Sequence, residues 1–433
     1  MPNLDEVFGI RTRPVLSYVE RTEVDARFQQ ATTQDSHIVI YGSSKQGKTA
    51  LRQKHIADDD MIVVRCGPNM STESVYRSIL RQSGIRLETT NVSETGTKAS
   101  AKTRVGFKAL IPIFGGGEAE VGGEIEGNST NSLSWEFVGY DLGEAQAIGE
   151  LLQKAAFAKY VVLENFHYLQ DETQRSLAFD LKTFHEMKVR FVILGIWQEA
   201  NLLLFYNSDL QDRIVEIPVE PWTSADFDRV IATGCGVLNI QIDPRILAIL
   251  KQQAYGNIGL LQEFLRVACE EAEILKTQDK NVAISDIALA QKAIDRKLHD
   301  QKGQLLQMLQ NIAAKSRMRT DTESPLLLPY YLVMAILRLP IDNFKTGVTK
   351  QQLQEFIRGN HHRNDNETPR TSDITNLVIQ LPIYQKEMSS PFLHYNSEDK
   401  KIRIVDMRYF FVLANTDRNA MLDEIPLPTT PAN

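Results

Sequence analysis

The 433-residue chain is poor in three features, and each shortage argues against a class of protein. It has only three cysteines, far apart and without a C-x-x-C pair, so neither a disulfide framework nor a zinc site is indicated. Its longest apolar run, residues 326–341, is interrupted by Pro329, Arg338 and Pro340 and is better explained as a buried helix than as a membrane span. The first residues lack the basic and apolar regions of a signal peptide. We therefore expect a cytoplasmic protein with no membrane partner.

Positive charge is also scarce. The chain has 48 Lys and Arg residues against 55 Asp and Glu residues, which gives a net charge of −7. Residues 301–433 carry 16 of the basic and 14 of the acidic residues, so residues 1–300 hold the negative balance. This distribution argues against a protein whose main activity is to coat nucleic acid, and it assigns any DNA contact to the C-terminal part. With 42% hydrophobic residues, the chain is long enough for two or three domains.

The most specific motif is Gly-Ser-Ser-Lys-Gln-Gly-Lys-Thr at residues 42–49, which matches the phosphate-loop pattern G-x-x-x-x-G-K-[ST]. A β-branched run, residues 37–41, precedes the motif, and a helix-competent segment follows it. This strand-to-helix context is the one that a phosphate loop requires. The sequence therefore predicts a protein that binds a nucleoside triphosphate.

Each position of the loop has an expected role. The glycines allow the backbone to curl so that successive N–H groups point at a phosphate, with the N-terminus of a helix behind them. Lys48 is expected to reach the β- and γ-phosphates of ATP, and the Thr49 hydroxyl to bind Mg²⁺. The predicted nucleotide ligands in the loop are Gly42, Ser43, Ser44, Lys45, Gln46, Gly47, Lys48 and Thr49.

Further apolar runs alternate with helical patterns, as a parallel α/β sheet requires. They are nearly continuous rather than alternating, which is typical of strands that are buried on both faces. With the strand before the phosphate loop they make five predicted strands, at residues 37–41, 61–66, 159–164, 189–195 and 214–219. The sequence thus predicts an α/β fold built on a five-stranded parallel sheet.

The third of these strands ends in Glu164, which is followed by Asn165. In phosphate-loop ATPases this strand delivers one carboxylate to Mg²⁺ and a second that polarises the attacking water. Two interpretations follow. Either Glu164 serves the metal and Asn165 leaves hydrolysis slow, or Glu164 is itself the base and the metal relies on Thr49 and water. A nucleotide-binding scaffold without turnover is a third possibility.

The order of these motifs resembles the AAA+/STAND branch of phosphate-loop ATPases. Residues 256–265, Gly-Asn-Ile-Gly-Leu-Leu-Gln-Glu-Phe-Leu, are similar to the G-x-I-G-x-L stretch of TniB-like transposition regulators and origin-recognition ATPases. Residues 18–25 are similar to the linker that holds the adenine in such proteins, which makes Arg21 a candidate adenine-site residue. The resemblance covers roughly residues 15–300.

The resemblance also suggests roles for residues outside the loop. Arg213 stands where family members present an arginine finger to the γ-phosphate of a neighbouring subunit, and the alternative is a surface arginine at the start of a strand. The sensor arginine of many AAA+ members has no counterpart, because Leu260 and Leu261 occupy its place. Gln198 is a candidate γ-phosphate sensor, and Trp197 is expected to pack.

The expected domains are an N-terminal linker at residues 1–36, a phosphate-loop core at 37–222, a helical lid at 223–316 and a winged helix at 325–420. Residues 90–140 form an insertion in the core, and residues 96–127 hold 8 of the chain's 24 glycines. Alternating apolar residues there indicate inserted β-hairpins, with a mobile surface loop as the alternative. The third helix of the winged helix is poor in Lys and Arg, which favours a protein contact over DNA.

From the residues and the resemblance together we expect an ATP-binding, oligomerising AAA+/STAND-type switch that uses Mg²⁺, hydrolyses ATP slowly and contacts a protein partner. The resemblance extends this expectation to anti-phage defence. The alternative is an ATP-dependent DNA-binding regulator of the transposition or replication type, which would bind DNA through the winged helix.

Overall fold

The computed structural model describes residues 1–9, 11, 13–90, 106–112, 133–136, 142–197, 201–318, 326–362, 369–385, 391–396 and 399–427. The chain divides into two compact units. Unit 1 comprises Met1–Val19, Ser43–Gly47 and Glu220–Asn433, and unit 2 comprises Glu20–Gly42 and Lys48–Val219. None of the helices within the described ranges is long and apolar enough to cross a membrane.

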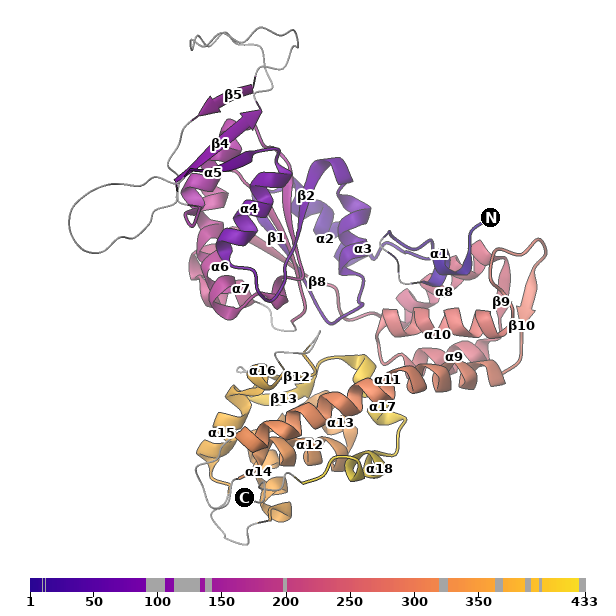
Figure 1. Ribbon diagram of the computed structural model, residues 1–433. Helices are drawn as coiled ribbons and strands as arrows, with labels where there is room; N and C mark the ends of the chain where they lie inside the picture. The colour runs from indigo at the N-terminus through magenta and orange to yellow at the C-terminus, as the bar shows by residue number, and fades with distance from the viewer. Residues whose placement is uncertain are drawn as a thin grey trace. The chain divides into compact units, whose positions relative to one another are not determined.

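Unit 2 contains the five-stranded parallel sheet that the sequence predicts (Figure 1). Its order is β2-β6-β7-β1-β8, so β7 lies between the strand that leads into the phosphate loop and the strand that ends in Glu164. The strands are β1 (His37–Tyr41), β2 (Met61–Arg65), β6 (Tyr160–Glu164), β7 (Phe191–Gly195) and β8 (Ile214–Pro218).

Helices cover both faces of this sheet, which is why the strand runs are apolar throughout. Alternate β1 residues face opposite sides: Val39 packs in one apolar cluster, and Ile38 and Ile40 pack in another. The first cluster includes α4 (Thr72–Gln82), α5 (Ala145–Lys154), α6 (Asp171–Glu186) and α7 (Leu202–Tyr206), and the second includes α2 (Thr22–Thr33) and α3 (Lys48–His55). The short 3-10 helices η1 (Asp58–Asp60), η2 (Phe166–Tyr168) and η3 (Ser208–Leu210) lie in the connections.

The predicted insertion contains β structure. Strand β4 (Gly106–Pro112) pairs antiparallel with β3 (Arg86–Thr90) on one side and with β5 (Leu133–Glu136) on the other. These strands agree with the β-hairpins expected from the alternating pattern. The clustered glycines at 115–117 and 122–123 lie outside the described residues.

In unit 1, the lid is helical, as predicted. It consists of α8 (Ser224–Leu238), α9 (Pro244–Gln253), α10 (Ile258–Glu271) and α11 (Ala288–Ala314), with a parallel pair of short strands, β9 (Ile240–Ile242) and β10 (Val282–Ile284). Thr223 and Asp226 form a capping box at the start of α8, as their spacing predicts. The N-terminal α1 (Leu4–Phe8), which falls in the expected linker, packs against α8 and α10.

The C-terminal part of unit 1 has the predicted winged-helix layout. Its three-stranded sheet has the order β11-β13-β12, and β12 and β13 form the wing. The strands are β11 (Val348–Thr349), β12 (Leu393–Asn396) and β13 (Lys401–Ile404). The helices are η4 (Lys315–Met318), α12 (Leu328–Arg338), α13 (Ile341–Thr346), α14 (Lys350–Asn360), α15 (Thr371–Ile379), α16 (Leu381–Tyr384), α17 (Met407–Ala414) and α18 (Arg418–Asp423).

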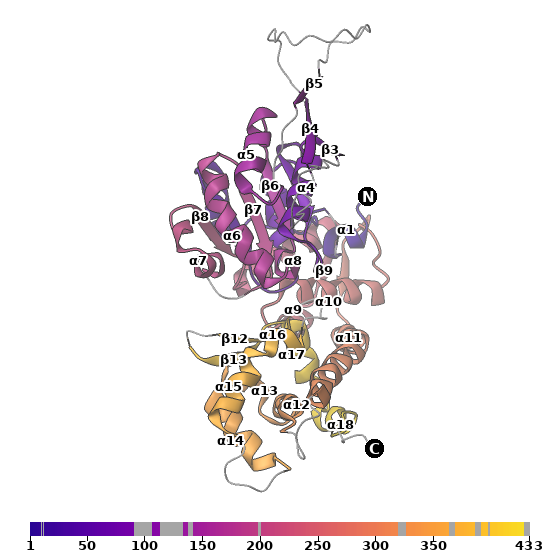
Figure 2. The ribbon, with the colours of Figure 1, turned by 60° about the vertical axis from the view of Figure 1, so that its left-hand side comes forward.

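The lid and the winged helix share one apolar core, so they behave as one packed body. Helix α11 lies against α12 and α17 (Figure 1; Figure 2). Aromatic rings join the two parts: the ring centroids of Phe264 in α10 and Phe411 in α17 are 5.2 Å apart, and those of Tyr255 and Phe410 are 5.0 Å apart. A displacement of α17 would therefore be transmitted to the lid helices.

Candidate nucleotide site

The phosphate loop has the backbone that its glycines predict. Gly42, directly after β1, has φ 144°, and Gly47, directly before α3, has φ 87°. Both angles lie in the region that only glycine adopts without strain. Lys45 between them also has a positive φ, 61°. The loop thus curls between the end of a strand and the N-terminus of a helix, which is the arrangement that binds phosphate.

The unit 2 end of the loop carries the predicted phosphate and metal ligands. Lys48 Nζ donates a hydrogen bond to the Gly42 carbonyl oxygen at 2.9 Å, so the ammonium closes over its own loop. Thr49 is exposed at the start of α3. No group of three His, Cys, Asp or Glu side chains in the described part of the chain could hold a metal ion. A Mg²⁺ ion held at Thr49 would therefore need oxygen ligands from the nucleotide and water.

His167 faces the same region and remains neutral. Burial, together with the Lys48 ammonium, lowers the pKa of His167 to about 4. The Ile196 N–H donates to His167 Nδ1 at 3.3 Å, so the ring proton resides on Nε2. A buried, neutral ring held by a backbone N–H is typical of a packed histidine rather than a catalyst.

Glu164, predicted as metal ligand or base, is held by arginines. Arg52, on α3 and almost fully buried, donates from Nη2 to Glu164 Oε1 at 2.8 Å, and Arg65 Nε lies 3.7 Å from Oε2. Asn165 follows in the left-handed region with φ 60° and is exposed. To serve a metal ion or a water, the Glu164 carboxylate would have to exchange Arg52 for that ligand.

Arg213 lies at the N-terminal ends of β8 and β1, whereas the phosphate loop begins at the C-terminal end of β1. Its neighbour Ile214 pairs with His37, the first residue of β1, whereas Gly42 follows the last. The five residues of β1, roughly 17 Å of extended strand, separate these two ends. Arg213 Nη1 donates to the Asp209 carbonyl oxygen at 2.5 Å, and its buried Nε has no hydrogen-bond partner among the described residues. This position excludes contact with its own loop and is compatible with a finger offered to a neighbouring chain.

Arg21 is buried at the start of α2. Its Nη1 donates to the Val219 carbonyl oxygen at 2.7 Å, and its backbone N–H donates to Asp25 Oδ2 at 2.7 Å. It therefore ties the segment predicted to hold the adenine to the end of β8.

The unit 1 part of the loop, Ser43–Gly47, contacts residues that the sequence analysis did not single out. Glu220 accepts hydrogen bonds from the Ser43 N–H and from Gln46 Nε2, both at 2.6 Å. Trp222 Nε1 donates to the Gln46 carbonyl oxygen at 3.4 Å. The only signal available in the sequence was an acid directly after the last predicted strand.

The G-x-I-G-x-L stretch of the lid lies directly against this part of the loop. Asn257 Nδ2 donates to the Ser44 carbonyl oxygen at 3.3 Å, and the Ile258 N–H donates to Gln46 Oε1 at 3.3 Å. A Cβ atom on Gly259 would lie 2.5 Å from the Cβ of Lys45. Close approach of the lid to the loop thus requires glycine at position 259.

Charged side chains strengthen the contact between lid and loop. Lys45 Nζ lies 2.6 Å from Glu263 Oε1 on α10, and Lys297 on α11 pairs with the other oxygen of Glu263. Leu260 and Leu261, which follow Gly259 on α10, are fully buried. Gln198 lies outside the described residues, and Trp197 stacks on Tyr41 with 6.1 Å between ring centroids, as expected of a packing residue.

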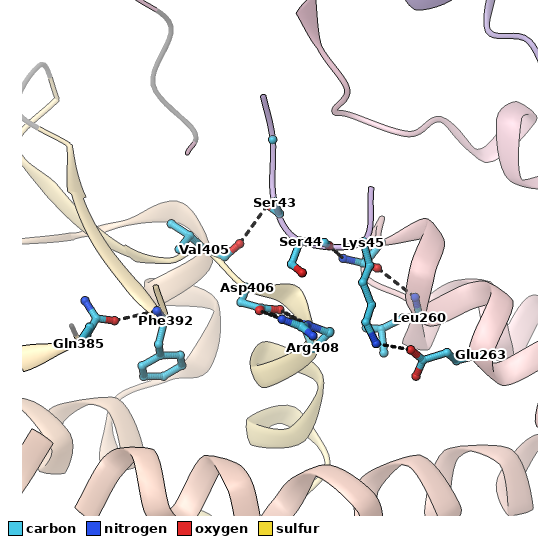
Figure 3. Close-up of polar contacts among 12 residues, drawn as sticks. Ser43, Ser44, Lys45, Leu260, Glu263, Gln385, Phe392, Val405, Asp406 and Arg408 are labelled. Carbon is cyan, nitrogen blue, oxygen red and sulfur yellow. Dashed lines mark hydrogen bonds and ion pairs between the residues drawn. The ribbon is translucent and has the colours of Figure 1, made fainter. Parts of the chain in front are cut away.

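The winged helix also reaches the loop. Ser43 Oγ donates to the Val405 carbonyl oxygen at 3.0 Å (Figure 3). Val405 directly precedes Asp406 and Arg408 at the start of α17. The five loop residues of unit 1 are therefore contacted by the β8–α8 connection, the lid and the winged helix.

The five-stranded sheet, the phosphate loop, the helical lid and the winged helix together form an AAA+-type phosphate-loop ATPase fold. No protein-family model matches the chain, and no curated protein sequence matches it. Solved structures do match. The Aeropyrum pernix Orc1 protein in complex with DNA is 14% identical, with 95% of this chain and 94% of that chain covered and a TM-score of 0.42.

Two further solved structures match with similar sequence identity and coverage. A Walker-type ATPase of Pyrococcus abyssi is 12% identical, with 94% and 99% covered and a TM-score of 0.49. Cdc6p of Pyrobaculum aerophilum is 12% identical, with 98% and 99% covered and a TM-score of 0.35. The matched structures include proteins of the origin-recognition kind, the kind that the motif order of this chain resembles. At this identity the likeness transfers no activity, substrate or partner.

Proposed function

We propose that this protein is a cytoplasmic ATP-binding switch of the AAA+ type that self-associates in the triphosphate-bound form and hydrolyses ATP slowly. The observation that carries this proposal is the set of contacts around Ser43–Gly47. The lid and the winged helix contact the same loop residues that would bind the phosphates. Binding of a nucleotide must then alter the contacts that the C-terminal elements make.

The residues fit a magnesium nucleotide. The positive φ angles of Gly42 and Gly47 supply the curl of the loop, and Lys48 can leave the Gly42 carbonyl for a phosphate oxygen. Thr49 would bind Mg²⁺, with Glu164 as a second ligand once Arg52 releases it. When bound, Mg²⁺ neutralises charge on the phosphates. The remaining loop residues hold the phosphates, and Arg21 positions the segment next to the adenine.

The residues at the end of β6 support slow hydrolysis. Asn165 can orient a water but cannot accept its proton, and Glu164 is paired with Arg52. Self-association is supported by the position of Arg213, because an arginine finger at this position could serve only the site of another chain. A protein partner is supported by α15, the third helix of the winged helix, because Thr371–Ile379 contains no Lys or Arg while Ile379 is 66% exposed.

A nucleotide-binding measurement tests the proposal. We expect Lys48→Ala to abolish ATP binding in calorimetry, because it removes the loop cation nearest the phosphates. Lys54→Ala is the matched control, since Lys54 lies on the same helix α3 and pairs with Glu20 at 3.3 Å on the surface. Undiminished ATP affinity of Lys48→Ala would contradict the functional assignment of the loop. Mass photometry of the parent with and without ATP tests self-association.

The second candidate is an ATP-dependent DNA-binding regulator of the transposition or replication type. Its support is the wing, where Lys400, Lys401 and Arg403 are close together, although Arg403 is paired with Asp399. We expect Lys400→Ala with Lys401→Ala to reduce both DNA affinity and its salt dependence if the wing binds DNA. If these changes do not alter the DNA affinity, the wing does not bind DNA, and the interpretation that the winged helix contacts a protein partner is favoured. A role in anti-phage defence would rest on family analogy alone.

A further inference from the structure

We propose that Arg408, at the start of α17 in the winged helix, is a ligand for the terminal phosphate of the nucleotide on the Ser43–Gly47 loop. Asp406 would hold the Arg408 guanidinium until that phosphate arrives. This inference rests on the proposed binding of ATP. The winged helix would then supply a phosphate-binding arginine, whereas Leu260 and Leu261 occupy the place of the sensor arginine in the lid.

The first observation is the geometry of the pair. Arg408 Nε donates to Asp406 Oδ1 at 2.8 Å and to Oδ2 at 3.1 Å, and Nη2 also pairs with Oδ2. A carboxylate and a phosphate present similar pairs of oxygens to the planar donors of a guanidinium. Asp406 therefore occupies the donors that a phosphate would use.

Burial distinguishes this pair from a surface pair of the same design. On the lid, Asp243 caps α9 and accepts from Arg245 Nε at 3.0 Å and from Arg245 Nη2 at 2.8 Å, the same two-residue spacing. The Arg245 side chain is 67% exposed, whereas that of Arg408 is 15% exposed and Asp406 is buried. The capping pair alone therefore does not indicate a site.

The second observation is the surroundings of Arg408. The hydrogen bond from Ser43 Oγ to the Val405 carbonyl oxygen joins the start of α17 to the loop, and Figure 3 shows Arg408 beside Asp406, on the side toward Lys45. The Arg408 charge acts on both members of the Lys45–Glu263 pair. Burial lowers the pKa of Lys45, Glu263 opposes this shift, and the Lys297 and Arg408 charges add to it.

Three cations and three carboxylates lie around the loop: Lys45, Lys297, Arg408, Glu263, Asp406 and Glu220. Lys45 and Lys297 share Glu263, whereas Asp406 pairs with Arg408. A phosphate can therefore gain the Arg408 guanidinium by displacing one carboxylate, and a guanidinium can bind two phosphate oxygens at once.

The test compares the affinity of the full chain for magnesium ATPγS and for ADP by calorimetry. We expect Arg408→Ala to weaken ATPγS binding about tenfold or more and ADP binding little, because a lost charge-assisted hydrogen bond affects only the nucleotide that carries the terminal phosphate. Arg245→Ala, the matched control on the lid, should leave both affinities unchanged. Asp406→Asn keeps an α17 cap but removes the competing charge, so it should raise ATPγS affinity several-fold.

The outcomes separate this inference from the proposed function. If the parent chain binds neither nucleotide, the proposed function fails and this inference fails with it. If the parent binds both and Arg408→Ala binds them as the parent does, or weakens both equally, only the assignment of Arg408 is overturned. Should Arg408→Ala fail to fold, two milder variants test the assignment of Arg408. Arg408→Lys retains the positive charge, and Asp406→Asn retains the cap of α17. Unchanged selectivity in both would overturn the assignment.

Discussion

Glu164 is the residue predicted to serve either the metal ion or the attacking water, and its partner is Arg52. Arg52 lies on α3, the helix that begins at Lys48, and its guanidinium is 2.8 Å from the Glu164 carboxylate. A nucleotide that draws Lys48 away from the Gly42 carbonyl would act on the same helix. Release of the acid would then be linked to occupancy of the loop, whether Glu164 serves the metal ion or the water.

The identity of residue 165 distinguishes the two roles of Glu164. We expect Asn165→Asp to raise the turnover of ATP if Glu164 is the metal-side acid, because general-base assistance is typically worth about 10² to 10⁴ in rate. If Glu164 is already the base, Asn165→Asp should have little effect, and Glu164→Gln should trap bound, unhydrolysed ATP. Steady-state phosphate release at saturating ATP measures both variants. Many turnovers per second in the parent, unchanged by either substitution, would place the chemistry elsewhere.

At the scale of elements, α10 begins against the phosphate loop because Gly259 lacks a side chain. A Cβ atom there would also lie 2.8 Å from the Lys45 carbonyl oxygen, so Gly259→Ala forces the loop or α10 to shift. We expect a loss of about 1 to 3 kcal/mol in the free energy of unfolding and weaker ATP binding.

The matched control is Gly236→Ala within α8. A Cβ atom at Gly236 meets nothing within 4 Å, so alanine should leave stability unchanged or raise it by up to about 1 kcal/mol. Urea denaturation and ATP calorimetry of both variants check the prediction. Identical behaviour of the two would mean that α10 does not press on the loop.

Strand β1 gives unit 2 a pH-dependent stability. Complete burial lowers the pKa of His37 from 6.5 to about 4, while its Nε2–H donates to the Leu181 carbonyl oxygen at 2.8 Å and Nδ1 accepts from the Phe191 N–H at 3.1 Å. As the pH falls, the unfolded chain takes up the proton first. The stability from neutral His37 is therefore complete above about pH 6.5 and is lost progressively toward pH 4.

The expected loss from His37 is on the order of 3 kcal/mol. His37→Gln can keep one donor and one acceptor, so its stability should fall less steeply between pH 6.5 and pH 4. His299→Gln, at an exposed position of α11, should follow the parent curve. Urea denaturation at several pH values measures the slopes. Parallel curves for the parent and His37→Gln would exclude His37 as the source of the pH dependence.

Much of the element structure could be predicted from the sequence. Strands buried on both faces leave near-continuous apolar runs, and the glycines of the phosphate loop are a local requirement, so both are visible in the sequence. The contacts that hold the loop are not. Ser43 and Val405 are 362 positions apart, and Arg52 and Glu164 are 112 apart. Nothing near Val405 in the sequence carries a motif, and the motif that ends three residues before Arg52 does not indicate that Arg52 pairs with Glu164. Only the packed fold brings these pairs together.

At the scale of the whole molecule, Arg213 bears on whether one chain suffices for hydrolysis. It lies at the N-terminal end of β8, and Gly42 follows the opposite end of the neighbouring strand β1, so within one chain Arg213 cannot reach the phosphates. We expect Arg213→Ala to bind ATP like the parent but to assemble poorly or hydrolyse ATP at least about tenfold more slowly, because a finger in trans stabilises the transition state. Arg77→Ala, which breaks an exposed pair with Glu73 at 2.7 Å, should behave like the parent.

A subunit-mixing experiment tests the trans arrangement directly. Lys48→Ala retains Arg213 but lacks a working loop, whereas Arg213→Ala retains the loop but lacks the finger. Neither variant alone should hydrolyse ATP appreciably. In a mixture, the loop of an Arg213→Ala chain can face Arg213 of a Lys48→Ala chain, so phosphate release should recover in part as the ratio approaches one to one. If the mixture is as inactive as its components although mass photometry detects mixed assemblies, Arg213 is not the residue that completes a neighbouring site.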